Sequence, residues 1–196
     1  MAPILDGIVV ADFSRVLAGP LATVMLADLG ADVIKLERPG TGDDTRRWGP
    51  PWTDGTSAYF ESANRSKRSV ELDLDDPEDR AAARELARRA DVLVENFRSG
   101  SLDAKGFGYD DLAAANPRLI YCSISGYGQS GPAAERAAYA MIVHAESGFD
   151  TSLMRYAGDR ERPAAGAIFV ADILGGIFGY SAIQTALVQR GRTGEG

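Results

Sequence analysis

The sequence has very little cysteine and histidine: among 196 residues there is one of each, Cys122 and His144. A lone cysteine cannot form a disulfide within the chain, and one cysteine with one histidine is too small a set for a structural zinc site. The glycine-rich motif that cradles phosphates in P-loop proteins is also absent. These absences exclude a disulfide-stapled domain, a zinc fold and a P-loop nucleotide site.

Positive charge is scarce as well. Lysine and arginine number 21 against 28 aspartates and glutamates, so the net charge is −7. An overall negative field disfavours nucleic acid, and a phosphate-bearing ligand has to meet locally clustered arginines and helix N-termini. The N-terminus does not combine a basic start with a long apolar run. We expect a soluble, cytoplasmic protein that has no nucleic-acid partner, no membrane partner and no metal.

Hydrophobic residues make up 45% of the chain, which is enough for one substantial core. Their pattern predicts strands at residues 8–12, 33–37, 69–73, 91–95 and 119–125, and helices at 21–29, 57–63, 78–89, 110–115 and 172–189. Strands separated by helices predict an α/β fold, namely a Rossmann-like, doubly wound and mostly parallel sheet. Ligands of such sheets bind beyond the carboxyl ends of the strands.

The segment from Asp12 to Pro20 combines the end of a strand with a turn and the start of a helix. Gly19 and Pro20 suit the opening of that helix, whose free amides would face a ligand beyond the strand. Two other segments, residues 38–56 and 126–132, are longer and more polar than plain connections require. Because long loops in compact α/β proteins are usually functional, we expect both to take part in binding.

Six blocks of sequence follow one another in a characteristic order: residues 12–20, 30–39, 64–74, 91–98, 116–120 and 125–132. With these blocks the chain resembles the N-terminal half of the family III CoA-transferases, which include formyl-CoA transferase, carnitine CoA-transferase and the α-methylacyl-CoA racemases. The resemblance covers essentially the whole chain. It implies that residues 1–196 are the N-terminal part of the family's large domain, without the small domain and truncated after the helix at 172–190. It also implies an interlocked homodimer for the full-length form.

The family's nucleophile is an aspartate, and the matching residue here is Asp172. The resemblance implies an acyl-CoA:carboxylate CoA-transferase in which this residue passes through a mixed anhydride and an aspartyl-CoA thioester. A position at a helix start would keep Asp172 ionised, and Gly175 and Gly176 would leave space for the thioester and offer amides to the oxyanion. From the pattern alone, an aspartate before an apolar helix is most often only an N-cap.

CoA would be a substrate, with no tightly bound cofactor. For its binding the resemblance points to nine residues: Val16, Leu17, Ala18, Arg38, Leu72, Asn96, Phe97, Arg98 and Tyr139. Arg38 follows a strand end, where its guanidinium can reach a phosphate. Without the resemblance, Arg38 would be taken for a solvated surface arginine, Leu72 for a core residue and Asn96 for a turn residue.

Three positions depart from the formyl-CoA transferase pattern, because Asp75, Ala104 and Ala137 stand where that enzyme type has basic residues. Their replacement puts contacts to the phosphates of CoA in doubt, although Lys105 lies next to Ala104. Four other cations could substitute for them: Arg15, Lys67, Arg68 or Arg98.

Two other functions are open for the same chain. An α-methylacyl-CoA racemase-like enzyme needs a histidine and an aspartate for proton exchange, and Tyr139 stands where that histidine would be. The other alternative is a catalytically inactive CoA-binding fragment. His144 is expected on a partly buried helix face, with a role near the acyl pocket as the alternative. The partners implied by transfer are an acyl-CoA and a carboxylic acid acceptor.

Overall fold

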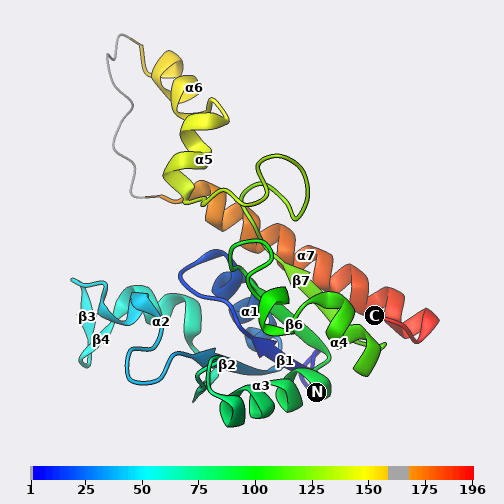
Figure 1. Cartoon of the computed structure of the whole chain (residues 1–196). Helices are drawn as coiled ribbons and strands as arrows, with labels where there is room; N and C mark the ends of the chain where they lie inside the picture. Colours follow the sequence, from blue (N-terminus) through cyan, green and yellow to red (C-terminus); the bar gives the residue numbers. More distant parts are fainter. Residues whose placement is uncertain (1, 159–167) are drawn as a thin grey trace.

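A parallel sheet of five strands forms the centre of the protein, and the computed structural model describes residues 2–158 and 168–196. The order across the sheet is β5-β2-β1-β6-β7 (Figure 1). The strands are β1 Val9–Asp12, β2 Asp32–Glu37, β5 Arg68–Glu71, β6 Val92–Glu95 and β7 Ile120–Ser123. All four neighbouring pairs are parallel, so the prediction of a Rossmann-like α/β fold is confirmed.

Helices cover both faces of this sheet. One face carries α1 Ala18–Asp28 and α7 Val170–Thr193, and the other carries α3 Pro77–Arg89 and α4 Tyr109–Ala115. Successive side chains of a strand point to opposite faces of the sheet. In β1, Val10 packs in the same cluster as residues of α1 and α7, whereas Ala11 packs with residues of α3. The sheet is therefore buried on both sides, as parallel sheets usually are.

The chain changes its direction of travel across the sheet at β1. From β1 it passes through α1 to β2 and then to β5 on one side, and α3 carries it back to β6 on the other side of β1. The connections that follow β1 and β6 consequently diverge. In sheets of this kind ligands bind in the crevice at such a switch point, which here lies beyond Asp12 and Glu95.

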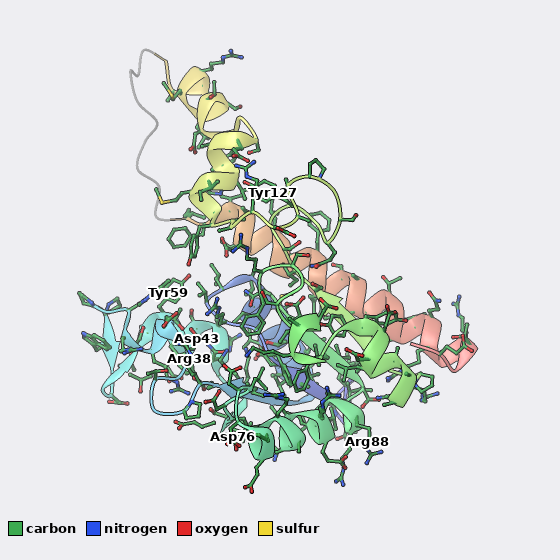
Figure 2. All side chains as sticks on the ribbon, in the orientation of Figure 1. Arg38, Asp43, Tyr59, Asp76, Arg88 and Tyr127 are labelled. Atoms are coloured by element: carbon green, nitrogen blue, oxygen red, sulfur yellow. The ribbon has the colours of Figure 1, made fainter. Side chains whose placement is uncertain are left out.

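The local sequence explains where α3 begins and which face it buries. Asp76, labelled in Figure 2, caps the helix: its carboxylate accepts hydrogen bonds from two backbone amides of the first turn. Pro77 occupies the first helical position, where its missing amide hydrogen costs no hydrogen bond. Ala83 and Ala87 form the buried stripe, and their small side chains allow the helix to lie close to the sheet.

The two helices on the opposite face, α1 and α7, pack along each other. Glycine makes this approach possible, because a Cβ atom at Gly176 would lie 2.7 Å from the backbone oxygen of Ala18. With 24 residues, α7 is long and apolar enough to cross a membrane by length and composition alone. One side of α7 packs on α1 and β7, and several of its apolar side chains are exposed on the other side.

The long segment after β2 contains more local structure than the sequence pattern indicated. It consists of the 3-10 helix η1 Asp44–Arg47, the antiparallel pair β3 Trp52–Thr53 and β4 Thr56–Ser57, and the helix α2 Ala58–Asn64. Only α2 was predicted, because strands of two residues are too short to show an alternating pattern. A second 3-10 helix, η2 Asp103–Lys105, precedes α4.

Two short helices, α5 Ala140–Glu146 and α6 Phe149–Tyr156, stand away from the sheet (Figure 1). Gly148 separates them with a φ of 78°, a left-handed conformation in which glycine is unstrained. The prediction of a partly buried helix around His144 is confirmed by α5, whereas α6 was not predicted. Contacts between α5 and α7 bring this part of the chain to the carboxyl edge of the sheet.

Candidate active site

A cleft of about 350 Å³ opens at the switch point of the sheet. Its walls come from five parts of the chain: the loop after β1, Asp44 of η1, the loop after β6, residues between Ile124 and Val143, and the first turns of α7. These parts are distant in sequence, and the parallel topology brings them together because the carboxyl ends of the strands meet at one edge.

Most of the residues singled out in the sequence line this one cleft, and they are Val16, Ala18, Asn96, Phe97, Arg98, Tyr139 and Asp172. Three others do not line it. Leu17 is the N-cap residue of α1, and Leu72 packs against the hydrophobic core on the α3 face. Arg38 is exposed in the segment after β2, in the part of the molecule where Figure 2 also shows Asp43.

Asp172 lies inside the first turn of α7 and not before it. The helix begins at Val170, after the N-cap residue Phe169, so the interpretation of Asp172 as an N-cap is wrong. Burial raises the pKa of the half-buried Asp172 carboxyl, against the lowering effects of its own backbone amide and of His144. The expected ionising effect of the helix start is thus outweighed by desolvation.

The glycines that follow Asp172 do not have the role expected from the sequence. Gly175 lines the cleft, but Gly176 faces α1. Both lie within α7, where each backbone amide donates to the carbonyl four residues earlier. Their amides are therefore not free to stabilise an oxyanion, and Gly176 serves the packing of two helices.

The loop after β1 is held in an unusual conformation. Val16 has a φ of 67°, in the left-handed region that β-branched residues rarely adopt. The Arg15 amide donates to Oδ1 of Asn96 at 2.8 Å, and Nδ2 of Asn96 donates to the Arg15 carbonyl at 2.7 Å. The side chain of Asn96 therefore joins the loops after β1 and β6, which are two walls of the cleft.

Buried charges complete the support of this loop. The Val16 amide donates to Oδ2 of Asp43 at 3.1 Å, and Nζ of Lys35 lies 3.0 Å from the same oxygen. Lys35 also donates to the carbonyl of Ser14 at 2.8 Å. Burial alone would raise the pKa of Asp43, but Lys35 and hydrogen bonds from Thr45 lower it overall. The loop is thus fixed by ionised side chains that lie behind it.

A second buried ion pair lies beneath the loop. Asp12 is fully buried at the end of β1, and one of its oxygens lies 2.9 Å from Nζ of Lys67. Burial would raise the pKa of Asp12, but Lys67, Lys35 and two neighbouring hydroxyl groups lower it to about 2. Burial in turn lowers the pKa of Lys67 to about 8, in spite of Asp12. This pair supports the cleft from inside and does not line it.

The positive charge of the cleft comes from three arginines, namely Arg15, Arg98 and Arg136. The guanidinium of Arg15 lies 5.2 Å from the ring centre of Phe97. Arg98 donates to the carbonyl of Glu135 at 2.6 Å, and Arg136 pairs with Glu146. A planar guanidinium suits both phosphate and carboxylate groups.

The other cations considered in the sequence lie elsewhere. Lys67 is buried against Asp12, and Arg68 pairs with Asp32 at the amino ends of two strands. Lys105 pairs with Asp75. Arg15 and Arg98 are therefore the two that reach the cleft, and they are joined by Arg136. The sequence analysis missed Arg136, although it stands next to Ala137, where a basic residue was expected.

Tyr59 of α2 is a further residue that the sequence did not single out. Burial, and after it the negative charge of Asp172, raises the pKa of Tyr59 to about 12. Figure 2 shows Tyr59 on the part of the molecule that also carries Asp43. Nothing in the pattern of α2 separates an aromatic residue near a cleft from one in a core.

His144 of α5 contacts the start of α7. The amide of Ala171 donates to Nε2 of His144 at 3.0 Å, and the imidazole ring packs on Phe149 with 4.9 Å between ring centres. Because Nε2 accepts this hydrogen bond, a neutral imidazole carries its hydrogen on Nδ1. His144 does not line the cleft itself.

Comparison with known proteins gives the family. The sequence profile of CoA-transferase family III matches residues 5–196. The chain belongs to CoA-transferase family III. As a family III chain, it shares 48% identity over 192 residues with succinyl-CoA:glutarate CoA-transferase of Mus musculus and 49% over 201 residues with succinate–glutarate CoA-transferase of Agrobacterium fabrum. It shares 48% over 193 residues with acetyl-CoA:oxalate CoA-transferase of Acetobacter aceti.

These alignments cover 98%, 99% and 97% of this family III chain, but 43%, 49% and 48% of the three relatives. The crystal structure of a CAIB/BAIF family protein from Brucella suis matches with a TM-score of 0.91 and 46% identity, over 100% of this chain and 52% of that one. The chain thus spans about half the length of the relatives it matches. The predictions of the family and of the α/β fold are confirmed.

Proposed function

We propose that the protein carrying this chain is an acyl-CoA:carboxylate CoA-transferase with Asp172 as its nucleophile. The observation that carries this proposal is the placement of the Asp172 carboxyl, half-buried and with a raised pKa, in the cleft at the switch point of the sheet. A carboxylate in a partly desolvated site is a stronger nucleophile than one in water. Membership of the family makes a CoA thioester the natural electrophile.

In the proposed reaction an oxygen of Asp172 attacks the carbonyl carbon of the acyl-CoA thioester. The carbon–sulfur bond breaks, CoA leaves as a thiolate, and a mixed anhydride joins the acyl group to Asp172. The thiolate then attacks the aspartyl carbon, which releases the donor acid as a carboxylate and leaves an aspartyl-CoA thioester. The acceptor carboxylate attacks this thioester, which breaks the carbon–sulfur bond, releases the CoA thiolate and leaves a second mixed anhydride. The thiolate finally attacks the acceptor's acyl carbon in this anhydride. A new acyl-CoA leaves, the Asp172 carboxylate is restored, and no water enters.

For CoA we infer a path along the loops after β1 and β6. Val16, Ala18 and residues 96–98 line this part of the cleft, and Tyr139 lines the side near α5. The three cleft arginines supply positive charge for phosphates, in place of the basic residues missing at three family positions. The residues outside the cleft, which are Leu17, Arg38 and Leu72, are left for the far end of the CoA molecule.

The acids exchanged are proposed to include a small dicarboxylate. The relatives named above are, by their names, transferases for succinyl-CoA with glutarate and for acetyl-CoA with oxalate. A dicarboxylate keeps one free carboxylate while the other reacts, so its site needs a cation beyond the nucleophile. Any of Arg15, Arg98 and Arg136 that is not engaged by a phosphate meets this need, since all three line the same cleft as Asp172.

Two alternatives make different chemical demands. Racemisation needs a second base, and the position expected for it holds Tyr139, while Nε2 of His144 already accepts the Ala171 amide. A catalytically inactive module would bind CoA without forming a bond to Asp172. We favour transfer over both because the cleft combines a carboxyl with cations and offers no histidine.

Trapping with hydroxylamine tests the proposal. Full-length protein is incubated with acyl-CoA and hydroxylamine and then digested for mass spectrometry, and a hydroxamate at Asp172 is expected. Asp172→Asn should abolish this product and lower CoA exchange between acids by at least about 10³-fold.

The matched control is Asp150→Asn, which changes a half-buried carboxyl of α6 outside the cleft. Deuterium exchange at the α-carbon without acyl exchange would instead support racemisation, and CoA binding without either reaction would support the inactive module.

For the full-length protein we also propose an interlocked homodimer in the cytoplasm, as the resemblance to the family implies. Exposed apolar side chains on α7 support an interface, since Phe178 is 70% and Val188 59% exposed. Light scattering of the full-length protein should give twice the mass of one polypeptide.

A further inference from the structure

The first turn of α7 has no capping side chain of its own. Phe169, the N-cap residue, makes no side-chain hydrogen bond. The first amides of a helix lack partners within the helix and are usually satisfied by a Ser, Thr, Asp or Asn at the N-cap. Here the amide of Ala171 donates instead to Nε2 of His144, which comes from another helix, 27 residues earlier in the chain.

We propose that His144 is a positioning residue that fixes the orientation of Asp172. This inference rests on the proposed role of Asp172 as the nucleophile. Ala171 and Asp172 are adjacent in the same helical turn, so a shift of the Ala171 amide moves the reacting carboxyl as well. In an enzyme a misplacement of about 1 Å can lower the rate by about 10²-fold.

The imidazole is itself well held. It packs on the ring of Phe149, with 4.9 Å between the ring centres and 46° between the ring planes. The His144 side chain is half-buried. Because His144 does not line the cleft, it acts on the reaction through α7 and not by touching the substrate.

Two substitutions separate this role from a general structural one. His144→Leu keeps the bulk of the side chain and removes the acceptor, whereas His144→Gln replaces Nε2 by a carbonyl oxygen that can accept the same amide. In the full-length protein we expect His144→Leu to lower kcat by about 10- to 100-fold with KM for acyl-CoA changed less than about twofold. His144→Gln should recover most of kcat. Ala145→Ser, an exposed neighbour on α5, is the matched control and should behave as the parent protein.

The outcomes distinguish this inference from the function on which it rests. If His144→Leu keeps kcat within about twofold while Asp172→Asn is inactive, the positioning role is wrong and the nucleophile stands. If Asp172→Asn keeps its activity, the proposed function fails first.

Should His144→Leu fail to fold, nitrogen-15 NMR of the parent protein decides instead, with the His144 signal identified by its loss in His144→Gln. The neutral ring is expected to carry its hydrogen on Nδ1 with Nε2 as acceptor, and a hydrogen on Nε2 would overturn the inference.

Discussion

The two sides of the cleft are stabilised in different ways. On the sheet side, the loop after β1 is bonded to Asn96, Asp43 and Lys35, and a fully buried ion pair lies beneath it. On the helix side, within the part of the chain that the structure describes, the turn that carries Asp172 is tied to α5 by one imidazole hydrogen bond. Tyr139, the N-cap residue of α5, is 68% exposed.

This difference separates stability from chemistry within one site. Buried charges are costly unless they are fully hydrogen-bonded, and among the described residues every buried polar side-chain atom has a partner. The sheet side is therefore a rigid surface that exists before any ligand binds. The helix side carries the reacting carboxyl on a turn whose hydrogen bond to α5 comes from one imidazole. We expect substitutions on the sheet side to change stability first and those on the helix side to change activity first.

The largest effect on stability is expected when one partner of the buried ion pair is removed. Lys67→Met leaves the Asp12 carboxylate without its nearest cation, and breaking a buried pair in this way typically costs about 3–5 kcal/mol. Equilibrium urea unfolding measures this loss. The neighbouring Arg68→Met is the matched control, because its exposed pair with Asp32 contributes less than about 1 kcal/mol.

A double variant sharpens this test. The double variant Asp12→Asn/Lys67→Met has neither charge of the pair. Its free energy of unfolding should therefore fall less than that of Lys67→Met alone. Equal losses for Lys67→Met and Arg68→Met would show that the sheet side is no more constrained than the surface.

Acid should weaken the same region by a smaller amount. The folded pKa of Asp12 is about 2 against 3.8 for the free residue, so between these values the unfolded chain binds more protons. The stabilisation is complete above about pH 4 and is lost as the pH falls to about 2, which corresponds to about 2 kcal/mol for this carboxylate. Unfolding by urea at a series of pH values measures the slope. A slope that Asp12→Asn leaves unchanged would contradict the assignment.

The strands could be predicted well from the sequence because their signal is local. The run Val92-Leu93-Val94 between polar turns is typical of a strand buried on both faces, and β6 begins within one residue of the prediction. The start of α7 was misplaced for an equally local reason. Its N-cap residue, Phe169, is not a capping residue type, whereas Asp172 is, so the pattern favoured a later start.

The candidate site was only partly predictable. Asn96, which lies in one of the six sequence blocks, and Asp172, which was matched to the family's nucleophile, do line one cleft. Contacts between distant segments left no signal, and the bond from Ala171 to His144 is of this kind. A valine likewise gives no indication of a left-handed φ, since Val16 adopts it only because side chains from other elements hold the loop.

An effect of intermediate size is expected when the link that Asn96 makes between the loops after β1 and β6 is removed. Asn96→Ala removes two hydrogen bonds to the backbone of Arg15, each of which contributes about 1 kcal/mol. We expect the affinity for CoA to fall about tenfold, since the loop that lines the cleft loses one of its supports. Isothermal titration with CoA measures this. Asn96→Asp keeps an acceptor for the Arg15 amide and should lose less, and an unchanged affinity in Asn96→Ala would argue against the role of this link.

The smallest change in the free energy of unfolding is expected when Val16 is replaced. Whether the replacement stabilises or destabilises the fold is more informative than the size of the change. A left-handed φ costs a residue with a Cβ atom about 1–2 kcal/mol, while glycine adopts it freely but adds about 0.5–1 kcal/mol of unfolded-state entropy. Val16→Gly should therefore stabilise the fold by up to about 1 kcal/mol and still weaken CoA binding, because a side chain lining the cleft is lost. Val16→Ala, which keeps the strain, should gain no stability in the same urea titration. If glycine and alanine destabilise equally, the loop is not strained, and the rigidity of the sheet side has to come from the buried ion pairs alone.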